Sequence, residues 1–304
     1  MKSLRIIITA VSLALVLVSC EREEELGNVD NIPGLGGDTW TPTAIDKWIV
    51  DSLTTPYNIT AKYKWDQSEL PLNRILVPPK EEKVIPSLSS IRRGWIQPYV
   101  DEAGLLFFKQ ISPKFFTLVG SPSYNSDGSI TLGTAEGGRK VVLYELNEFR
   151  VKGMPGYVLA DTTRVLRMFW VIHHEFAHIL DQNVKFPLEF SESSASSYTS
   201  DWTNVTPQEA LNEGFVSQYA ISGKEDDWAE MVSFMLVYGR EWFDNRVNSI
   251  NYTGTTANGT TAAEARARLR QKEAAVVSYF KQAWNIEFYN LQLRSRYAIN
   301  SLLY

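Results

Sequence analysis

The middle of the chain carries the stretch Val171-Ile172-His173-His174-Glu175-Phe176-Ala177-His178-Ile179-Leu180-Asp181, and this stretch decides the fold. It contains the motif His-Glu-x-x-His, formed by His174, Glu175 and His178. On a helix, positions i and i+4 lie one above the other, so the two imidazoles converge on one point and can bind one metal ion. Glu175 is rotated by about 100° around the helix from His174. It is therefore poorly placed as a third ligand, but it can hold a water molecule bound to the ion.

The composition of this stretch favours a metal site over a chance occurrence of the motif and over purely structural histidines. A motif with three fixed letters also occurs by chance, and two histidines on a buried helix could be core residues bonded to the backbone. However, all 3 histidines of the chain lie in this stretch, and their neighbours are apolar almost all round. Two histidines and a glutamate are costly to bury in such a helix without a partner. We therefore predict a buried helix over 162–180 that binds Zn²⁺.

The overall composition is that of a globular domain. The 304 residues are 44% hydrophobic and 12% aromatic, which is ample material for one packed domain. The net charge is −5, and no basic run with interleaved aromatic residues is present. We therefore predict that nucleic acid is not a partner.

The first 42 residues are predicted to lie outside the folded domain. Residues 1–20 have a positive start, a short apolar core and the ending Leu17-Val18-Ser19-Cys20, which is typical of a bacterial lipoprotein signal peptide. Cys20 is the only cysteine of the chain, and we expect it to carry the acyl groups that attach the protein to a lipid bilayer. An ordinary secretory signal or an anchor helix is the alternative. Residues 21–42 are predicted to form a flexible tether.

The residues after Cys20 bear on the location of the protein. The run Glu21-Arg22-Glu23-Glu24-Glu25 resembles the surface-export signal of Bacteroidetes lipoproteins. That resemblance implies an outer-membrane lipoprotein exposed at the cell surface, with a periplasm-facing position as the alternative.

Hydrophobic periodicity predicts an α+β fold over residues 43–304, with a small mixed sheet and several packed helices. Helices are expected at 45–53, 85–100, 162–180 (with Asp161 or Thr162 as its N-cap), 208–219 (with Pro207 in its first turn), 226–238, 262–284 and 288–303. Strands are expected at 57–65, 105–119 and 128–146, a turn at 125–128, and loops at 133–138, 185–204 and 251–261. We expect the strand at 139–146 to border the cleft and to pair with an extended substrate. Residues 43–160 would then hold the N-terminal helices and the sheet, 161–240 the metal-site helices, and 241–304 the C-terminal helices.

The third metal ligand has to be a carboxylate, because no histidine remains after the motif. Two histidines and a carboxylate with an open water position are typical of catalytic zinc. Asp226 and Glu230 are four residues apart and share one helix face, so helix geometry treats them equally. Glu213, in Asn212-Glu213-Gly214, is a third candidate, whereas Glu225 points away from the face of Asp226. The residues alone leave these candidates open.

The segment from Tyr219 to Glu230 looks like the Y-x₆-E-x-[FW]-A-E arrangement of lethal-factor-like zinc peptidases. In that arrangement the acidic residue seven positions after the tyrosine is the third ligand, which implies Asp226 here. Aspartate is one methylene shorter than the usual glutamate, so either the helix sits closer or Glu230 supplements the site. Glu230 is also expected to hydrogen-bond a ligating histidine.

The stretches Trp48–Trp65 and Val77–Val100, with the metal helix, further resemble the substrate import-associated zinc metallohydrolase lipoproteins of Bacteroidetes. This resemblance covers the chain from about Ile45 to its end. It implies a zincin-like metallopeptidase domain that serves a TonB-dependent importer and its surface-binding lipoprotein.

These observations predict a zinc peptidase that cleaves amide bonds of peptides or glycopeptides in support of nutrient import. Glu175 is expected to act as the general base, and Tyr219 to donate a hydrogen bond to the developing oxyanion. We expect His173 to lie at the rim of the site or to contact a ligand. The alternative is a catalytically silent, metal-stabilised binding lipoprotein. A zinc-dependent deacetylase or another amide hydrolase is also compatible with the motif.

Overall fold

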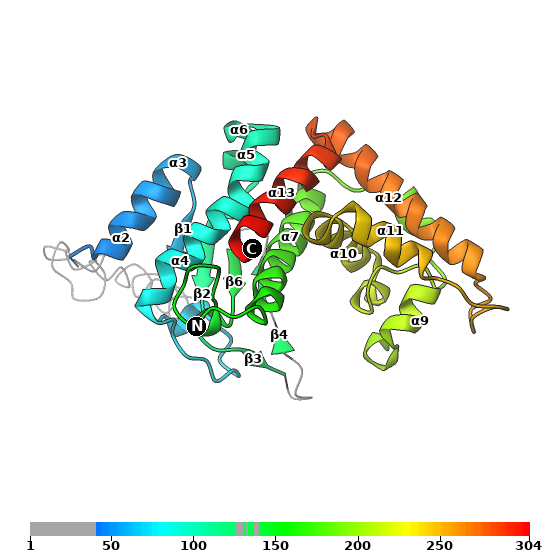
Figure 1. Ribbon diagram of the computed structural model, residues 1–304, viewed down its shortest axis with the longest axis horizontal. Coiled ribbons are helices and arrows are strands. Elements are labelled where there is room, and N and C mark those ends of the chain that lie inside the picture. Colours follow the sequence, from blue (N-terminus) through cyan, green and yellow to red (C-terminus); the bar gives the residue numbers. More distant parts are fainter. Residues whose placement is uncertain (1–40, 126–129, 132, 137–139) are drawn as a thin grey trace, which may run out of the picture. The chain divides into compact units, whose positions relative to one another are not determined.

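Four strands form the sheet beside the histidine helix, in the order β1-β2-β6-β5 (Figure 1). β1 (Thr60–Lys62), β2 (Phe115–Leu118) and β6 (Lys140–Leu143) are parallel, whereas β5 (Gly133–Glu136) is antiparallel to β6. A second sheet pairs β3 (Ser123–Tyr124) with β4 (Ile130–Thr131). This computed structural model describes residues 41–125, 130–131, 133–136 and 140–304, and residues 43–304 form one unit.

Helices make up most of this unit. Those before the site are α2 (Ala44–Ile49), η2 (Val50–Thr54), α3 (Thr55–Tyr57), η3 (Gln67–Glu69), α4 (Glu81–Ile91), η4 (Arg92–Ile96), α5 (Gln97–Ala103), α6 (Leu105–Ile111) and η5 (Leu146–Glu148). Those from the site onward are α7 (Asp161–Asn183), α8 (Glu189–Glu192), η6 (Trp202–Asn204), α9 (Pro207–Asn212), η7 (Tyr219–Ser222), α10 (Lys224–Tyr238), α11 (Arg240–Asn248), α12 (Ala262–Trp284) and α13 (Phe288–Leu303). The α+β fold that the sequence predicts, with its small mixed sheet, is confirmed.

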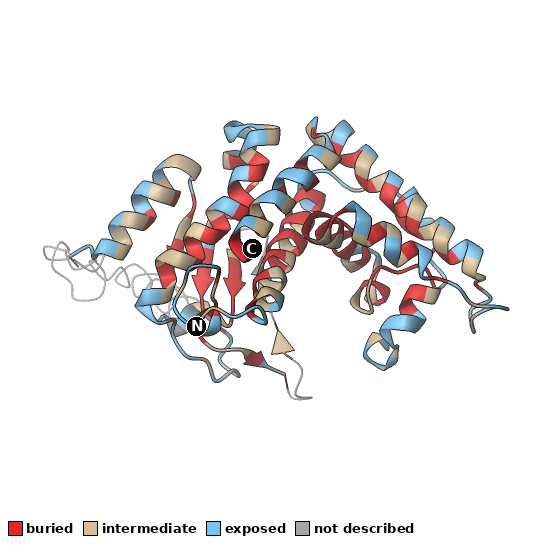
Figure 2. Ribbon diagram, viewed as in Figure 1, coloured by how far each residue is buried: buried red, intermediate tan, exposed pale blue. Residues whose placement is uncertain are grey.

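The helix α7 runs through the main hydrophobic core, and both it and α10 are largely buried (Figure 2). On the side of α7 away from the two motif histidines, Phe176 contacts the ring of Trp95 edge-on, with the ring centroids 5.3 Å apart. Gly94 precedes this tryptophan, and a Cβ there would overlap the ring of Phe169. Glycine therefore lets η4 approach α7 closely, which fixes the position of the histidine helix in the core.

Most of the predicted helices are found. Those at 162–180, 226–238, 262–284 and 288–303 correspond to α7, α10, α12 and α13. The predicted helix at 45–53 is continued by η2 and α3, the one at 85–100 is formed by α4, η4 and α5, and the strand at 57–65 shortens to β1. The segment 251–261 is irregular, as predicted, whereas 185–204 contains the short helices α8 and η6. No individual helix was predicted at residues 240–248, which form α11.

The predicted strand at 105–119 is wrong in its first half, where the chain forms α6. Gly104 has a φ of +87°, which ends α5 and lets a new helix begin at Leu105. Phe108 is fully buried, whereas Leu105 and Leu106 are exposed. The apolar run therefore places one residue of a helical turn in the core, and a run this short does not distinguish a helix from a strand.

The predicted roles of residues 128–146 are also corrected. The predicted loop at 133–138 contains β5 at residues 133–136. The predicted strand at 139–146 ends earlier, because Glu145 has a φ of +64° and turns the chain into η5. β6 lies between β2 and β5, so it has no edge with which to pair a substrate. Within the described residues, the strand at that end of the sheet is β5.

Two further helix predictions are wrong in detail. The helix expected at 208–219 ends at Asn212, because Gly214 has a φ of +83°, so that Tyr219 lies in the separate turn η7. Neither Asp161 nor Thr162 caps α7, which has Ala160 at that position. The Asp161 carboxylate instead accepts a hydrogen bond from the Val158 amide at 3.0 Å.

Several predictions concern residues outside the described part of the chain. They are the signal peptide at 1–20, nearly all of the tether at 21–42, and all of the turn at 125–128 except Asn125. In the described residues, no helix combines the length and hydropathy needed to cross a membrane.

Candidate metal centre

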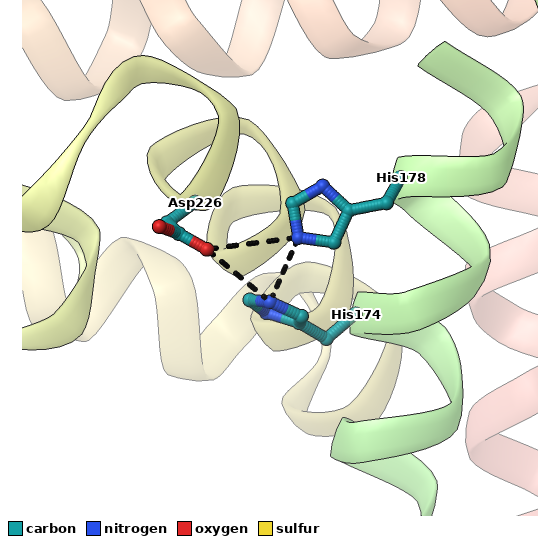
Figure 3. Close-up of side chains that lie close together, drawn as sticks. All are labelled: His174, His178 and Asp226. Carbon is teal, nitrogen blue, oxygen red and sulfur yellow. Dashed lines mark hydrogen bonds and ion pairs between the residues drawn. The ribbon is translucent and has the colours of Figure 1, made fainter. Parts of the chain in front are cut away.

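Two antiparallel helices carry the candidate metal ligands. α7 and α10 pack along their length. His178 of α7 faces Asp226 near the start of α10, and one turn along the pair His174 faces Glu230. The imidazoles of His174 and His178 project from α7 toward the Asp226 carboxylate (Figure 3). The structure thus brings together three side chains that are up to 52 positions apart in the sequence (226 − 174).

The spacing of the three side chains fits a zinc ion. The Nε2 atoms of His174 and His178 lie 3.1 Å apart. Oδ1 of Asp226 lies 3.8 Å from Nε2 of His174 and 3.6 Å from Nε2 of His178. Zinc bonds of about 2.0–2.2 Å at tetrahedral angles place ligand atoms about 3.3 Å apart. Shifts of a few tenths of an ångström would therefore suffice for one ion to bind all three atoms.

Asp226 presents one carboxylate oxygen to the histidines and the other to Ser222. The Ser222 hydroxyl donates a hydrogen bond of 2.9 Å to Oδ2, which leaves Oδ1 facing the imidazoles. Burial raises the pKa of Asp226, but hydrogen bonds from His178 and Ser222 outweigh it, and the pKa lies below its ordinary value. Asp226 is therefore ionised at neutral pH and oriented as a one-oxygen ligand.

Glu230 contacts His174 from the opposite side of the ring. Its Oε1 lies 2.8 Å from Nδ1 of His174, and its Oε2 accepts a hydrogen bond from the Ser217 hydroxyl. Burial lowers the pKa of His174, but Glu230 raises it more, so that the pKa lies above its ordinary value. Glu230 favours a proton on Nδ1, which leaves the Nε2 lone pair for a metal ion. Nδ1 of His174 thus donates a hydrogen bond to Glu230, and this is the contact with a motif histidine that the sequence predicts.

Glu175 and Tyr219 lie close to the same three side chains. The Glu175 carboxylate is near enough to raise the pKa values of His174 and Tyr219. The ring of Tyr219 lies 5.8 Å from that of His174 and 5.0 Å from that of Trp202, which belongs to the segment 185–204 predicted as a loop. Burial and the nearby Asp226 carboxylate raise the pKa of Tyr219. Its phenol therefore stays protonated at neutral pH and can donate a hydrogen bond.

The other acidic candidates lie elsewhere. Glu213 is buried in a separate network, where it accepts hydrogen bonds from Ser197 at 2.9 Å and Thr260 at 2.7 Å, and it pairs with Arg268 at 3.5 Å. Glu225 is exposed and does not face the histidines. Neither belongs to the histidine cluster of the described residues, because other partners or solvent surround their carboxylates.

His173 is not at the rim of the site, contrary to expectation. It is fully buried, with Nδ1 3.5 Å from the hydroxyl of Tyr99 and, among the described residues, no partner for Nε2. Burial lowers its pKa to about 3, so the ring is neutral. The residue one position before His174 lies on a different face of the helix, and here that face packs into the core.

Sequence reasoning missed two serines of the site. The sequence analysis assigns no role to Ser222, although it lies four residues before Asp226 and that spacing could have revealed it. Ser217 gives no such signal, because it lies 13 residues from Glu230 in a turn. Its hydroxyl also accepts a hydrogen bond from the Ala220 amide at 3.2 Å, which joins the turn of Tyr219 to Glu230.

Two histidines one turn apart on a buried helix, a carboxylate on a second helix and a glutamate beside the first histidine define a zinc metallohydrolase type of site. The comparisons agree. Residues 38–289 match the model of a family described as "putative zinc-binding metallo-peptidase", and the chain belongs to this family. A crystal structure from Bacteroides caccae of a protein described in the same words is similar to this chain, with 29% identity and a TM-score of 0.67. The match covers 85% of this chain and 92% of that one. No match was found among the curated proteins.

Proposed function

We propose that this chain is a zinc-dependent peptidase in which His174, His178 and Asp226 hold the metal and Glu175 transfers protons. The observation that carries the proposal is the convergence of the first three side chains on one point, on a helix that also bears Glu175 beside His174. A structural zinc site is usually closed by four protein ligands, whereas the cluster among the described residues has three. A position for water or substrate fits such a cluster.

The side chains around the cluster have distinct tasks in amide hydrolysis. A zinc ion bound here would polarise the scissile carbonyl and lower the pKa of a water molecule toward neutrality. Glu175 accepts a proton from the attacking water and passes it to the leaving amine. Tyr219 donates a hydrogen bond to the carbonyl oxygen as that oxygen gains negative charge. Glu230 holds the His174 ring in the tautomer with Nε2 free.

The sheet offers a place for the peptide backbone. β5 lies against α7 and ends the strand order β1-β2-β6-β5 within the described residues. An extended substrate can add to such an edge through main-chain hydrogen bonds. We therefore propose that β5, rather than β6 as predicted from the sequence, pairs with the substrate.

Substitution of Glu175 by glutamine tests the catalytic part of the proposal. Glu175→Gln should retain its zinc, because Glu175 is not one of the three converging side chains, but should lose cleavage of a peptide library. Zinc stoichiometry and mass spectrometry of the products measure the two effects. If the variant cleaves as fast as the wild type, the assignment of Glu175 is wrong. If the zinc-loaded wild type cleaves no peptide or glycopeptide, the peptidase proposal is wrong. Consumption of an acetylated substrate would then indicate a deacetylase, and no turnover at all would indicate a catalytically silent binding lipoprotein.

We further propose that the protein is an outer-membrane lipoprotein at the cell surface, where it supplies cleaved peptides or glycopeptides to a TonB-dependent importer and its surface-binding lipoprotein. The support is the lipoprotein-type ending Leu17-Val18-Ser19-Cys20 and the acidic run after it. Acylated Cys20 would attach the mature chain to the bilayer. Cys20→Ala should leave the protein unprocessed and unlabelled by palmitate. Protease digestion of whole cells separates the surface position from the periplasm-facing alternative.

A further inference from the structure

A small pocket of about 20 Å³ lies along α7, before the histidines in sequence. Its walls come from the end of β6, the turn after it, and α7. Leu143, Phe149, Met168 and Val171 provide apolar surface. A cavity needs about 10–15 Å³ of such space to hold one water molecule, so this pocket has room for one small group. It suits the carboxylate at the end of a side chain or of a peptide chain rather than a whole small molecule.

The pocket lies on the catalytic side of α7. Arg167, which lines it, is seven residues before His174, so two helical turns separate them and both side chains lie on the same face. A rise of 1.5 Å per residue puts their Cα atoms about 10 Å apart along the helix. An extended peptide spans roughly 3.3–3.6 Å per residue, so the pocket is about three residues from the scissile bond of a bound substrate.

The pocket is lined by two arginines, Arg164 and Arg167, and by one carboxylate, Glu145. Arg167 contacts Glu145 through Nη1 at 3.3 Å, and Arg164 contacts Asp161 through Nη1 at 3.4 Å. Each arginine side chain is about a third exposed, at 39% and 34%. A guanidinium has five N–H donors in a fork that matches a carboxylate, so one acidic partner leaves further donors for a second.

The contact with Glu145 also orients Arg167. Glu145 has a φ of +64°, which is uncommon for a residue with a side chain and occurs where the surrounding structure holds it. Here its amide donates a hydrogen bond to Ser121 at 3.0 Å, and its carbonyl accepts one from Glu148 at 3.1 Å. The Glu145 carboxylate is thereby fixed at the side of Arg167. An arginine held in this way needs little reordering when a substrate carboxylate arrives.

We propose that this pocket binds a carboxylate of the substrate about three residues from the scissile bond. This inference rests on the proposed peptidase function, whose substrate class it narrows. The carboxylate belongs to a glutamate or aspartate side chain or to the end of the peptide chain, and both present the same chemistry to a guanidinium. The apolar residues border the methylenes of the same side chain, and the N–H donors of Arg167 that Glu145 does not use select its charge.

The test uses a dye-labelled 12-residue peptide in which one glutamate is scanned through every position, with glutamine and lysine series as references. Each peptide is made with a free and an amidated C-terminus. Cleavage is measured with the zinc-loaded protein, and binding is measured by fluorescence polarisation with the zinc-loaded Glu175→Gln protein. Binding is therefore recorded independently of turnover.

We expect one scanned position, two to four residues from the cleaved bond, at which glutamate is preferred over glutamine by about tenfold or more, as for a charge-assisted hydrogen bond. Arg167→Gln should abolish this preference and leave the glutamine peptide nearly unaffected. Glu145→Gln should weaken the preference without abolishing it, because it removes the contact that holds Arg167 in place. Arg93→Gln on η4, which does not line the pocket, is the matched control and should behave as the wild type.

Each outcome decides the question. A preference that disappears on amidation assigns the pocket to the chain end, and one that persists assigns it to a side chain. Three results overturn the pocket assignment without affecting cleavage by the wild type. They are equal cleavage and binding of glutamate and glutamine peptides, a preference for lysine, and a glutamate preference that survives in Arg167→Gln. If nothing is cleaved but Glu175→Gln shows the Arg167-dependent binding preference, the pocket assignment holds and the peptidase function fails. If no peptide binds, both fail.

Discussion

The buried ion pair between Lys272 and Asp227 should control the stability of the metal centre. Lys272 of α12 and Asp227 of α10 have no exposed side-chain surface, and Nζ lies 2.7 Å from Oδ2. The ammonium also donates to the Gly214 carbonyl at 3.0 Å and lies 4.1 Å from the ring centroid of Phe215. Tyr198 donates a further hydrogen bond to Oδ2 of Asp227 at 2.8 Å. Because Asp227 directly follows Asp226, this pair ties the start of α10, and with it a candidate ligand, to α12.

We predict that Lys272→Met destabilises the protein by about 3–5 kcal/mol, because it leaves a buried carboxylate without its cation. At roughly 2–4 °C per kcal/mol for a domain of this size, the midpoint of thermal unfolding should fall by about 6–20 °C. Burial already raises the pKa of Asp227 to about 6. Without the lysine, the folded state should bind a proton more readily than the unfolded state does, so the deficit should shrink as the pH falls from 8 to 5.

Urea unfolding followed by tryptophan fluorescence, with zinc at the same saturating concentration in every sample, measures the change in free energy. Lys281→Met makes the same substitution on the same helix at a half-exposed pair with Glu287, and it should cost less than about 1 kcal/mol. The double variant Lys272→Met with Asp227→Asn should recover most of the loss, because it removes the uncompensated charge. A Lys272→Met protein within 1 kcal/mol of the Lys281→Met control would refute the reasoning, since it would mean that the pair contributes no more than a surface contact.

Three further results are expected. After dialysis against a mild chelator, Asp226→Ala should hold no zinc and Asp226→Glu should keep it. Glu230→Ala should bind zinc about 10–100-fold more weakly than the wild type. An Asp226→Ala protein that stays loaded would exclude Asp226 as a ligand. Tyr219→Phe should lower kcat by about a hundredfold with zinc content and KM nearly unchanged, as stopped-flow or steady-state cleavage assays can show. Burial raises the pKa of Asp161, but the hydrogen bond from Arg150 helps to hold this pKa below its ordinary value. The carboxylate therefore stabilises the fold above about pH 4, and this stabilisation is lost as the pH falls through the pKa of the folded state. The difference in melting temperature between wild type and Asp161→Asn should therefore be constant from pH 7 to 5 and narrow below pH 4.

The local parts of this structure follow from the sequence. A helix with two histidines one turn apart is encoded within five residues, so its position and the convergence of its imidazoles could be predicted from periodicity alone. The long C-terminal helices α12 and α13 are equally regular. The short apolar run of α6 was misassigned because its helical and extended patterns differ in only a few residues. The glycine-containing segment of β5 was misassigned because its pairing with β6 outweighs weak strand propensity.

The contacts between distant segments could not be derived in this way. The step from His178 to Asp226 spans 48 positions (226 − 178), and helix geometry left Asp226 and Glu230 equivalent as ligands until the family resemblance distinguished them. The structure separates the two residues physically. The Glu230 carboxylate accepts hydrogen bonds from Nδ1 of His174 and from Ser217, whereas Asp226 faces the Nε2 atoms of the two histidines. No local pattern encodes which side of an imidazole a carboxylate will reach.

The short side chain of Asp226 explains why so much of the surrounding structure acts on the start of α10. An aspartate has one methylene fewer than a glutamate with which to absorb a displaced helix, so its backbone has to be placed more accurately. Ser222 fixes the outer carboxylate oxygen, and the Asp227–Lys272 pair fixes the adjacent residue of the same helical turn. On the opposite side, Glu230 joins α10 to the His174 ring. Since these contacts are all buried or half-buried, they limit the movement of both helices. An aspartate is therefore compatible with the proposed metal site, which would tolerate misplacement of only a few tenths of an ångström.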